Sequence, residues 1–300
     1  MASERRAIAL GFFDGVHIGH AGLLNMTIKR AAEKGLRPAV LSFDIHPQNE
    51  ITGIHMPLIS SPADRTDIIH RLFGIEDVLY MHFDERFMRM PWQEFMDHLR
   101  DDFGAEHLVA GHDYTFGFKG EGTVERLREY GAQHGIGIDI IPEIKLDGVT
   151  VSSTYIRGLL KNGDLATAEK YLGHRYCFSD TVRQGYRFGR TIGAPTINMR
   201  FPEDVIELRH GVYATKVTIP ELGETEYSAV TNVGVRPTLG GTTEVSVESY
   251  LLDFDRNVYG KLVRVEFCSF LRPEVKFADT ELLKEQIARD VQTVREYFEK

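Results

Sequence analysis

The sequence has little of several features that mark particular classes of protein. Only two of its 300 residues are cysteines, Cys177 and Cys268, and they lie far apart among apolar neighbours. Two thiols cannot build a zinc cluster or a disulfide framework, so we expect two unpaired thiols and a reducing, cytoplasmic setting. No stretch approaches the roughly 20 apolar residues that span a bilayer. The short apolar run after Arg6 stops at Asp14 without a cleavage site behind it, which disfavours a signal peptide.

Positive charge is also in deficit, with 35 Lys and Arg against 44 Asp and Glu and a formal net charge of −9. This balance disfavours a general nucleic-acid or anionic-membrane surface but leaves room for a local phosphate pocket. We therefore expect neither nucleic acid nor a membrane as a partner. The charge does not bear on the assembly state, for which we expect a monomer or weak homo-oligomer. Apolar residues make up 42%, an ordinary globular share, and 300 residues suggest about two domains.

The first half of the chain alternates short apolar runs with amphipathic stretches. The runs that predict buried strands are Ala7–Phe12, Ala39–Phe43, Val78–Phe83, His107–Ala110 and Ile138–Ile141. The stretches that predict helices are Ala21–Lys34, Asp64–Leu72, Trp92–Asp102 and Thr123–His134. Strands that alternate with helices form βαβ units, so we predict an α/β domain with a doubly wound parallel sheet.

The pattern changes in the second half, where strand-like runs follow one another. These runs are Tyr176–Gln184, Val212–Ile219, Tyr227–Val233, Val245–Leu252 and Leu262–Phe270. Such a series predicts an antiparallel β-barrel or sandwich. One helix ends the chain, capped by Asp279 or Thr280, and its apolar stripe should pack against the barrel. We place the division near Gly173–Cys177, which gives domains of residues 1–174 and 175–300.

The first chemical motif lies where the first predicted strand meets the first predicted helix. The string from Gly11 to His20 reads GFFDGVHIGH. Ligands of open α/β sheets bind at the carboxyl ends of strands, where a helix start offers N–H groups to an anion. Gly19 lets a phosphate approach the backbone, and His17 and His20 can donate hydrogen bonds to its oxygens. Taken alone, such a pair also suits a metal site or a solvated turn.

This string resembles the His-x-Gly-His signature of the nucleotidyltransferase superfamily. More narrowly, it resembles the start of the adenylyltransferase domain in the prokaryotic bifunctional riboflavin kinase/FAD synthetase family. A second signature of the superfamily follows at a suitable distance, the run SSTYIR from Ser152 to Arg157. Ser153 and Thr154 can cap a helix and donate to phosphate oxygens, and Arg157 can reach the β- or γ-phosphate. As an isolated string, Ser-Ser-Thr is mostly a helix cap.

The segment GHDYTFG, residues Gly111–Gly117, lies between these motifs and is similar to a Gly-x-Asp-Phe-x-Phe-Gly segment of the family. Tyr114 stands where the family usually has Phe. The resemblance implies that Asp113, Tyr114 and Phe116 bind flavin. The alternative is that the two aromatic residues simply belong to the core.

The resemblance implies direct adenylyl transfer, in which the FMN phosphate attacks the α-phosphorus of ATP and pyrophosphate leaves. No covalent enzyme intermediate is required, and the work is positioning and charge stabilisation with Mg²⁺. His17 and His20 are then the catalytic residues, near the α-phosphate. The residues implied for binding ATP and its phosphates are Gly11, Phe13, Asp14, Gly19, Ser153, Thr154 and Arg157.

A second motif, GYRFGRTIGAPTIN, runs from Gly185 to Asn198. A glycine-rich loop can wrap phosphates with its N–H groups, although the Gly-Lys-Ser/Thr ending of a Walker loop is missing. An ordinary barrel turn is the alternative. The string resembles the riboflavin kinase signature, whose Pro-Thr-x-Asn is intact, and this implies Thr196 and Asn198 as Mg²⁺ ligands. The ATP-binding residues implied for the kinase are Gly185, Gly189, Arg190, Gly193, Thr196 and Asn198.

Three later strings also resemble the family, namely Asn232–Thr238, Val247–Asp253 and Leu271–Phe277. The second implies that Glu248 is the general base for the 5′-hydroxyl of riboflavin, whereas an exposed barrel carboxylate is the alternative. The third makes Arg272 a candidate flavin-binding residue, whereas a surface ion pair is the alternative.

The resemblance covers nearly the whole chain and implies a bifunctional enzyme. It would use ATP to phosphorylate riboflavin to FMN and then to adenylylate FMN to FAD. One alternative is that only one domain is active. Another is a flavin-binding regulatory protein with relic enzyme domains, which would be expected to have lost catalytic side chains.

Overall fold

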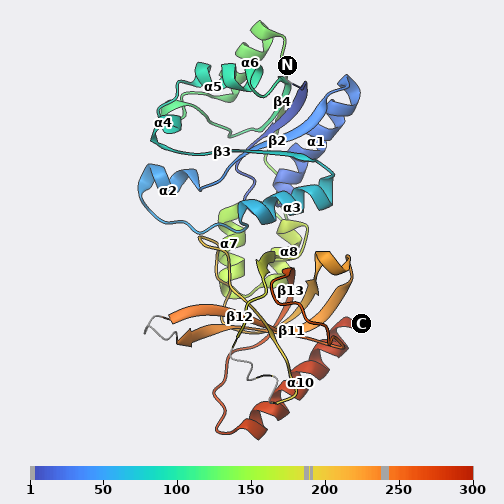
Figure 1. Cartoon of the computed structure of the whole chain (residues 1–300). Helices are drawn as coiled ribbons and strands as arrows, with labels where there is room; N and C mark the ends of the chain where they lie inside the picture. The colour runs from blue at the N-terminus through green and yellow to red at the C-terminus, as the bar shows by residue number, and fades with distance from the viewer. Residues whose placement is uncertain (1–3, 186–188, 190–191, 238–242, 300) are drawn as a thin grey trace. The chain divides into compact units, whose positions relative to one another are not determined.

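The computed structural model describes residues 4–185, 189, 192–237 and 243–299. These residues form two compact units. The first unit is Met1–Leu58 with Pro62–Ser153, and the second is Ile59–Ser61 with Thr154–Lys300. Figure 1 shows the chain coloured by residue number.

The first unit is built on a five-stranded sheet in which every neighbouring pair is parallel. Its strands are β1 (Arg6–Leu10), β2 (Arg37–Phe43), β3 (Asp77–Met81), β4 (Ala105–Gly111) and β5 (Gly137–Ile141). Their order is β3-β2-β1-β4-β5. The chain therefore extends the sheet to one side of β1 and then to the other. The carboxyl ends of β1 and β4 flank this reversal, which is where open α/β sheets bind ligands.

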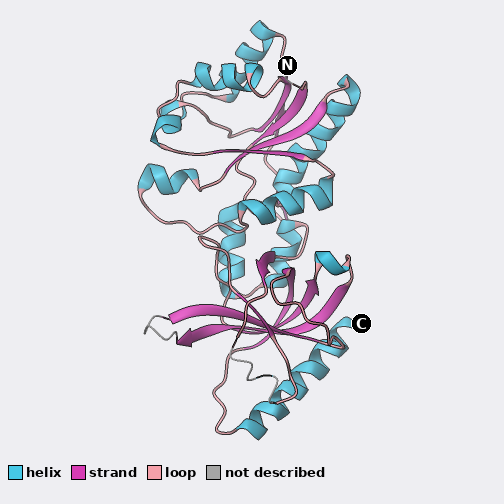
Figure 2. Cartoon of the chain, viewed as in Figure 1, coloured by secondary structure: helices cyan, strands magenta, loops and turns pink. Residues whose placement is uncertain are grey.

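Helices occupy the connections between these strands, shown in cyan in Figure 2. They are α1 (Ile18–Lys34), α2 (Pro47–Thr52), α3 (Pro62–Phe73), α4 (Glu85–Met88), α5 (Trp92–Asp101) and α6 (Val124–His134). A 3₁₀ turn (Phe118–Gly120) and the short strands β6 (Lys145–Leu146) and β7 (Val149–Thr150) complete the unit. Ile8, Leu108 and Phe95 belong to its apolar core, each at most 1% exposed. The predicted α/β domain is thus confirmed.

Helix α7 (Ser153–Asn162) begins at the last residue of the first unit, and α8 (Leu165–Leu172) follows it. The second unit contains a six-stranded antiparallel sheet of order β8-β13-β10-β11-β12-β9. Its strands are β8 (Cys177–Thr181), β9 (Ile197–Met199), β10 (Gly211–Thr218), β11 (Glu226–Pro237), β12 (Thr243–Leu251) and β13 (Leu262–Arg272). A bridge between Arg183 and Asn198 joins the two ends of this order. The result is the near-closed barrel that the strand series predicts.

The last helix, α10 (Thr280–Phe298), begins where Asp279 accepts a hydrogen bond from the Leu282 N–H at 2.9 Å. The C-terminal half of its apolar stripe packs against β10 and β11 through Val291, Val294 and Phe298. The N-terminal half, Leu283 and Ile287, lines a cavity instead. Among the described residues, no helix is long and apolar enough to cross a membrane.

Candidate active sites

The first cavity, of about 480 Å³, lies at the carboxyl ends of β1 and β4. It is therefore at the reversal of strand order, where the fold favours a ligand. Seven of the predicted site residues line it, namely Gly11, His17, Gly19, His20, Asp113, Tyr114 and Ser153. Three strings that are far apart in the sequence thus meet in one wall.

The two histidines of this wall are held in a fixed arrangement. Their rings stack with centroids 3.6 Å apart and planes 12° from parallel. His17 caps helix α1, because its Nδ1 accepts a hydrogen bond from the His20 N–H at 3.3 Å. This cap explains why the helix begins at Ile18, earlier than the apolar pattern predicts. With Nδ1 acting as an acceptor, the proton of a neutral His17 lies on Nε2, which can donate to a ligand.

His20 is suited to act as a neutral imidazole. Its pKa lies well below the ordinary value, first because the ring is buried and then because His17 and Arg65 add positive charge nearby. Its Nδ1 is shielded from solvent and has no hydrogen-bond partner among the described residues. Since buried polar atoms are almost always paired, this atom fits a site that a ligand completes.

Five other predicted residues lie elsewhere. Phe13 and Asp14 are 0% and 1% exposed and lie outside the described cavity wall. Phe13 has a positive φ of 55° and packs against the His20 ring, so it shapes the turn that carries the histidines. Phe116 belongs to the core, as its alternative interpretation states. Thr154 and Arg157 lie in α7 within the second unit, where Arg157 is buried.

Arg65 on α3 is a residue that the sequence analysis did not select. It is 0% exposed, and its Nη1 donates to Ser42 Oγ at 2.7 Å and to the Phe43 carbonyl at 2.9 Å. Its guanidinium lies 4.5 Å from the ring centre of Phe12, which lines the cavity. Burial lowers the pKa of Arg65, and the Asp14 carboxylate opposes this. Nothing in the polar pattern of α3 distinguishes this arginine from a solvated one.

The predicted flavin-binding segment contributes both aromatic and acidic side chains to the first cavity and its surroundings. Tyr114 stacks on Phe116 at 5.7 Å, and burial raises the pKa of the Tyr114 hydroxyl. Asp113 is exposed. The motifs did not include Glu143 and Thr150, which also line this cavity, and the Thr150 hydroxyl donates a hydrogen bond to Glu143 at 2.8 Å. Only their place after β5 and in β7 brings them to the cavity.

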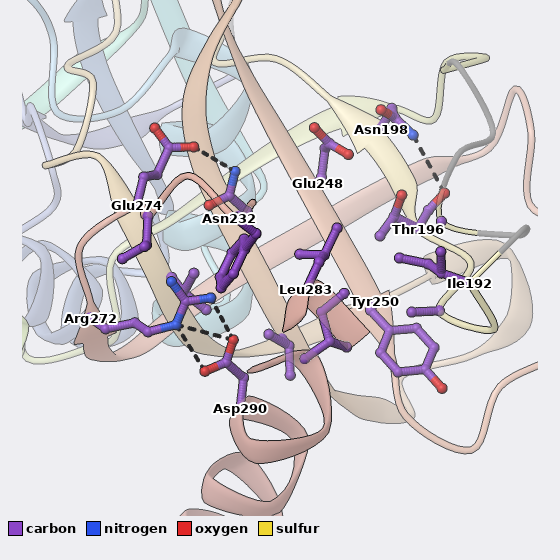
Figure 3. A pocket seen from close by; sticks show the side chains of 17 residues that line it. Ile192, Thr196, Asn198, Asn232, Glu248, Tyr250, Arg272, Glu274, Leu283 and Asp290 are labelled. Atoms are coloured by element: carbon purple, nitrogen blue, oxygen red, sulfur yellow. Dashed lines mark hydrogen bonds and ion pairs between the residues drawn. The ribbon is translucent and has the colours of Figure 1, made fainter. Parts of the chain in front are cut away.

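The second cavity, of about 270 Å³, lies on one face of the barrel sheet (Figure 3). Five of its residues form a row across five neighbouring strands, each paired in register with the next. In order they are Asn198 on β9, Glu248 on β12, Asn232 on β11, Val212 on β10 and Arg272 on β13. The register therefore places Glu248, the predicted base, directly between two carboxamides.

The glycine-rich motif supplies one side of this cavity through Gly189, Ala194 and Thr196. Gly185 gives room to Asn198, since a Cβ at Gly185 would lie 2.5 Å from Asn198 Oδ1. Asn198 Nδ2 donates a hydrogen bond to the Thr196 carbonyl at 3.4 Å. Gly193 has a φ of +79°, which favours glycine.

Arg190, predicted to bind ATP, lies outside the described residues.

The opposite side of the cavity is closed by β13, the segment after it and α10. Arg272 forms an ion pair with Asp290, with its Nε at 2.9 Å from Oδ1 and its Nη2 at 2.7 Å from Oδ2. The Arg272 side chain is 21% exposed and that of Asp290 is 6% exposed. Arg272 is therefore in an ion pair, as its alternative interpretation states, but the pair is partly buried and borders the cavity. Glu274 accepts a hydrogen bond from Asn232 at 2.9 Å. Asp290 was not predicted, because helical spacing alone does not show that α10 faces a cavity here.

A third cavity, of about 460 Å³, lies beside the second. Among the described lining residues, Thr196 is the one that both cavities share. The new cavity is otherwise lined by Pro195, Phe254, Arg256, Tyr259 and their neighbours. Thr196 therefore stands where ligands in the two cavities would meet.

Two family models match the chain. The model described as FAD synthetase matches residues 1–155, and the model described as Riboflavin kinase matches residues 172–298. Relatives named "Bifunctional riboflavin kinase/FMN adenylyltransferase" are 35% identical in Listeria monocytogenes and 34% identical in Bacillus subtilis. Each comparison covers 98% of this chain and 93% of the relative.

A crystal structure from Streptococcus pneumoniae, described as a macrolide-efflux protein, is 30% identical with a TM-score of 0.84. The match covers 97% of this chain and 94% of that chain, and it shows a shared fold. The two family models and the curated relatives agree with each other on both halves of the sequence. The chain belongs to the bifunctional riboflavin kinase/FMN adenylyltransferase family.

Proposed function

We propose that this protein makes FAD in two steps, phosphorylating riboflavin to FMN with ATP and then transferring an adenylyl group from ATP to FMN. The observation that carries the proposal is that each unit has its own cavity lined by the matching family motif. A flavin-binding regulatory protein with relic enzyme domains would be expected to have lost catalytic side chains. His17, His20 and Glu248 are instead all present in cavity walls.

In the kinase step, we assign riboflavin to the cavity of Glu248 and the nucleotide to the neighbouring cavity. Thr196 is common to both and so lies where the γ-phosphate and the 5′-hydroxyl would come together. Glu248 accepts the hydroxyl proton as that oxygen attacks the γ-phosphorus, and ADP leaves. Arg272 borders the flavin end of the same row.

Magnesium fits the donor set of the kinase site. Thr196 and Asn198 offer neutral oxygen atoms, which suit a hard cation. Gly185, Gly189 and Gly193 are proposed to bind the phosphates through the backbone of their loop. When bound, Mg²⁺ would neutralise charge on the transferring phosphoryl group. We propose Thr196 and Asn198 as its protein ligands.

In the adenylyl step, the FMN phosphate attacks the α-phosphorus of ATP and pyrophosphate leaves. His17, with its Nε2–H, and neutral His20 donate to phosphate oxygens as charge develops. Gly11 and Gly19 allow close approach, and Ser153 stands at the start of α7. Thr154 and Arg157 remain proposed ligands of the β- and γ-phosphates. Asp113 and Tyr114 are proposed to bind the flavin, with Phe13, Asp14 and Phe116 supporting them from behind.

We propose an adenylyltransferase domain of residues 1–174 and a kinase domain of residues 175–300. The described lining residues of each of the three cavities come from one unit. We propose a monomer or weak homo-oligomer that acts on small molecules in the cytoplasm, without nucleic acid as a partner.

A time course of purified protein with riboflavin, ATP and Mg²⁺ tests the function. FMN should appear first and FAD should follow, and excess EDTA should stop FMN formation. Supplying FMN directly should give FAD without a lag. If a folded sample forms neither flavin nucleotide, the proposal is wrong, and if it forms only one, the single-active-domain alternative holds.

A further inference from the structure

The wall segment between β13 and α10, residues 273–278, is anchored to the barrel by a side chain with no assigned role. Glu274 Oε1 accepts a hydrogen bond from Asn232 Nδ2 at 2.9 Å, as Figure 3 shows. The carboxylate also lies directly over Gly234. A Cβ at that glycine would lie 1.9 Å from Oε1 and 2.4 Å from the carboxylate carbon. Only glycine leaves room for this contact.

The contact sets the orientation of Asn232. A carboxylate only accepts hydrogen bonds, so the amide must turn its nitrogen towards Glu274 and its oxygen away. Asn232 is paired in register with Glu248 on the same face of the sheet. The side chain of Glu274 thereby fixes the polar group next to the proposed base.

Within this segment, Phe277 lines the cavity, and its ring centre lies 6.0 Å from the Arg272 guanidinium. Val275, which lines the cavity, is 56% exposed, so apolar burial contributes little there. At the base of the segment, Arg272 binds Asp290 and donates to the Pro273 carbonyl at 3.1 Å. Polar contacts at Arg272 and at Glu274 thus hold the wall against the sheet.

We propose that Glu274 is a positioning residue of the kinase site, acting through Asn232 and requiring a bare α-carbon at Gly234. By fixing Asn232 and the 273–278 segment, it shapes the end of the cavity that takes the flavin, not the nucleotide. This proposal rests on the proposed function in one respect, that riboflavin is the ligand of this cavity.

Two single variants break the contact from opposite sides. Glu274→Ala removes the carboxylate, and Gly234→Ala fills its place with a methyl group. The backbone at Gly234 is outside the positive-φ region, and the displaced atoms are the end of a flexible side chain, so the second variant should fold. Losing one hydrogen bond of this kind predicts an increase in KM for riboflavin of about 3- to 10-fold. KM for ATP and the rate of FAD formation from supplied FMN should not change.

A double variant and a conservative variant separate positioning from a general structural effect. In Gly234→Ala/Glu274→Ala the methyl group has nothing to displace, so KM should equal that of Glu274→Ala alone. Glu274→Gln keeps an oxygen acceptor for Asn232 and should stay within about 2-fold of the parent enzyme. The matched control is Glu285→Ala, which removes another exposed carboxylate, one on α10 that pairs with Arg289.

Each outcome decides the proposal. The proposal is supported if both single variants raise KM for riboflavin and the double variant raises it no further than Glu274→Ala alone. Unchanged KM in both single variants, additive effects in the double variant, or equal increases in both KM values overturn it. The parent enzyme distinguishes a failure of this proposal from a failure of the proposed function. If the parent enzyme forms no FMN from riboflavin and ATP, both the role of Glu274 and the proposed function are wrong.

Discussion

The two candidate sites of this protein are built in different ways. In the first unit, the wall comes from turns that follow parallel strands, and the key histidines are neighbours on one helix start. In the second, the wall is a row of side chains contributed by five different strands. The two histidines therefore stand in one short string, whereas the row draws its side chains from 75 positions, from Asn198 to Arg272.

The sites also differ in how they handle charge. In the first site, burial of the ring and then the nearby His17 and Arg65 lower the pKa of His20 well below its ordinary value. The second surrounds Glu248 with carboxamides and offers neutral oxygens at Thr196 and Asn198. The net charge of −9 disfavours anions generally, so each site must attract ATP through local groups.

Replacing Glu248, the proposed base, should give the largest effect and separate the two sites most clearly. Glu248→Gln keeps the shape of the side chain but cannot accept the hydroxyl proton. Because general base catalysis contributes about 10²- to 10⁴-fold, FMN formation should fall by that order while FAD formation from FMN continues. Separate assays with riboflavin and with FMN measure this. An equal loss in both assays would contradict the independence of the sites.

The converse change is His20→Ala. Loss of one donor to developing charge is expected to slow FAD formation about 10²- to 10³-fold, leaving riboflavin phosphorylation intact. His98→Ala, on the exposed side of α5, is the matched control and should change neither rate. If His20→Ala leaves FAD formation at the parent rate, our assignment of the first site is wrong.

A smaller effect is expected at the glycine loop. In Gly185→Ala the new methyl group would lie 2.5 Å from Asn198 Oδ1, so Asn198 must move from its place in the row. We expect KM for ATP in the kinase assay to rise by about 10-fold, the consequence of losing roughly 1.4 kcal/mol of binding. Gly158→Ala, where a Cβ meets no atom within 4 Å, is the control. An effect on riboflavin alone would argue against the assignment.

The smallest expected effect is the response of the first site to pH. The pKa of His20 is lowered in the folded protein, so the ring stays neutral as the pH falls from 8 to 6. The contribution of His20 to the rate of FAD formation should be flat over this range, as the ratio of parent to His20→Ala rates can show. Folding should weaken as the pH falls below the ordinary value of 6.5, because unfolded His20 then binds protons more readily than folded His20.

Local patterns predicted most of the elements, because each depends on neighbouring residues. The five parallel strands, α1, α3, α5, α6 and α10 all appear near their predicted places. The short strand β9 was missed, since three residues carry too little periodicity. Helices α7 and α8 were not predicted as elements, although Ile156 and Leu160 are buried at helical spacing in α7 and Leu165, Ala168 and Leu172 in α8. Helix α7 begins at Ser153, whose hydroxyl donates to the Asp14 carbonyl at 3.1 Å.

By itself, the sequence determined the class of each domain and the strings that bear the chemistry, from Gly11–His20 to Leu271–Phe277. Periodicity and motifs are local properties that one strand or turn expresses without its neighbours. Only the tertiary structure decided which of these residues meet. Strand register aligned Asn198, Glu248 and Asn232, burial made Arg65 a partner of Phe12, and packing seated Glu274 over Gly234. Such contacts join residues distant in sequence, so they depend on how whole elements pair and pack.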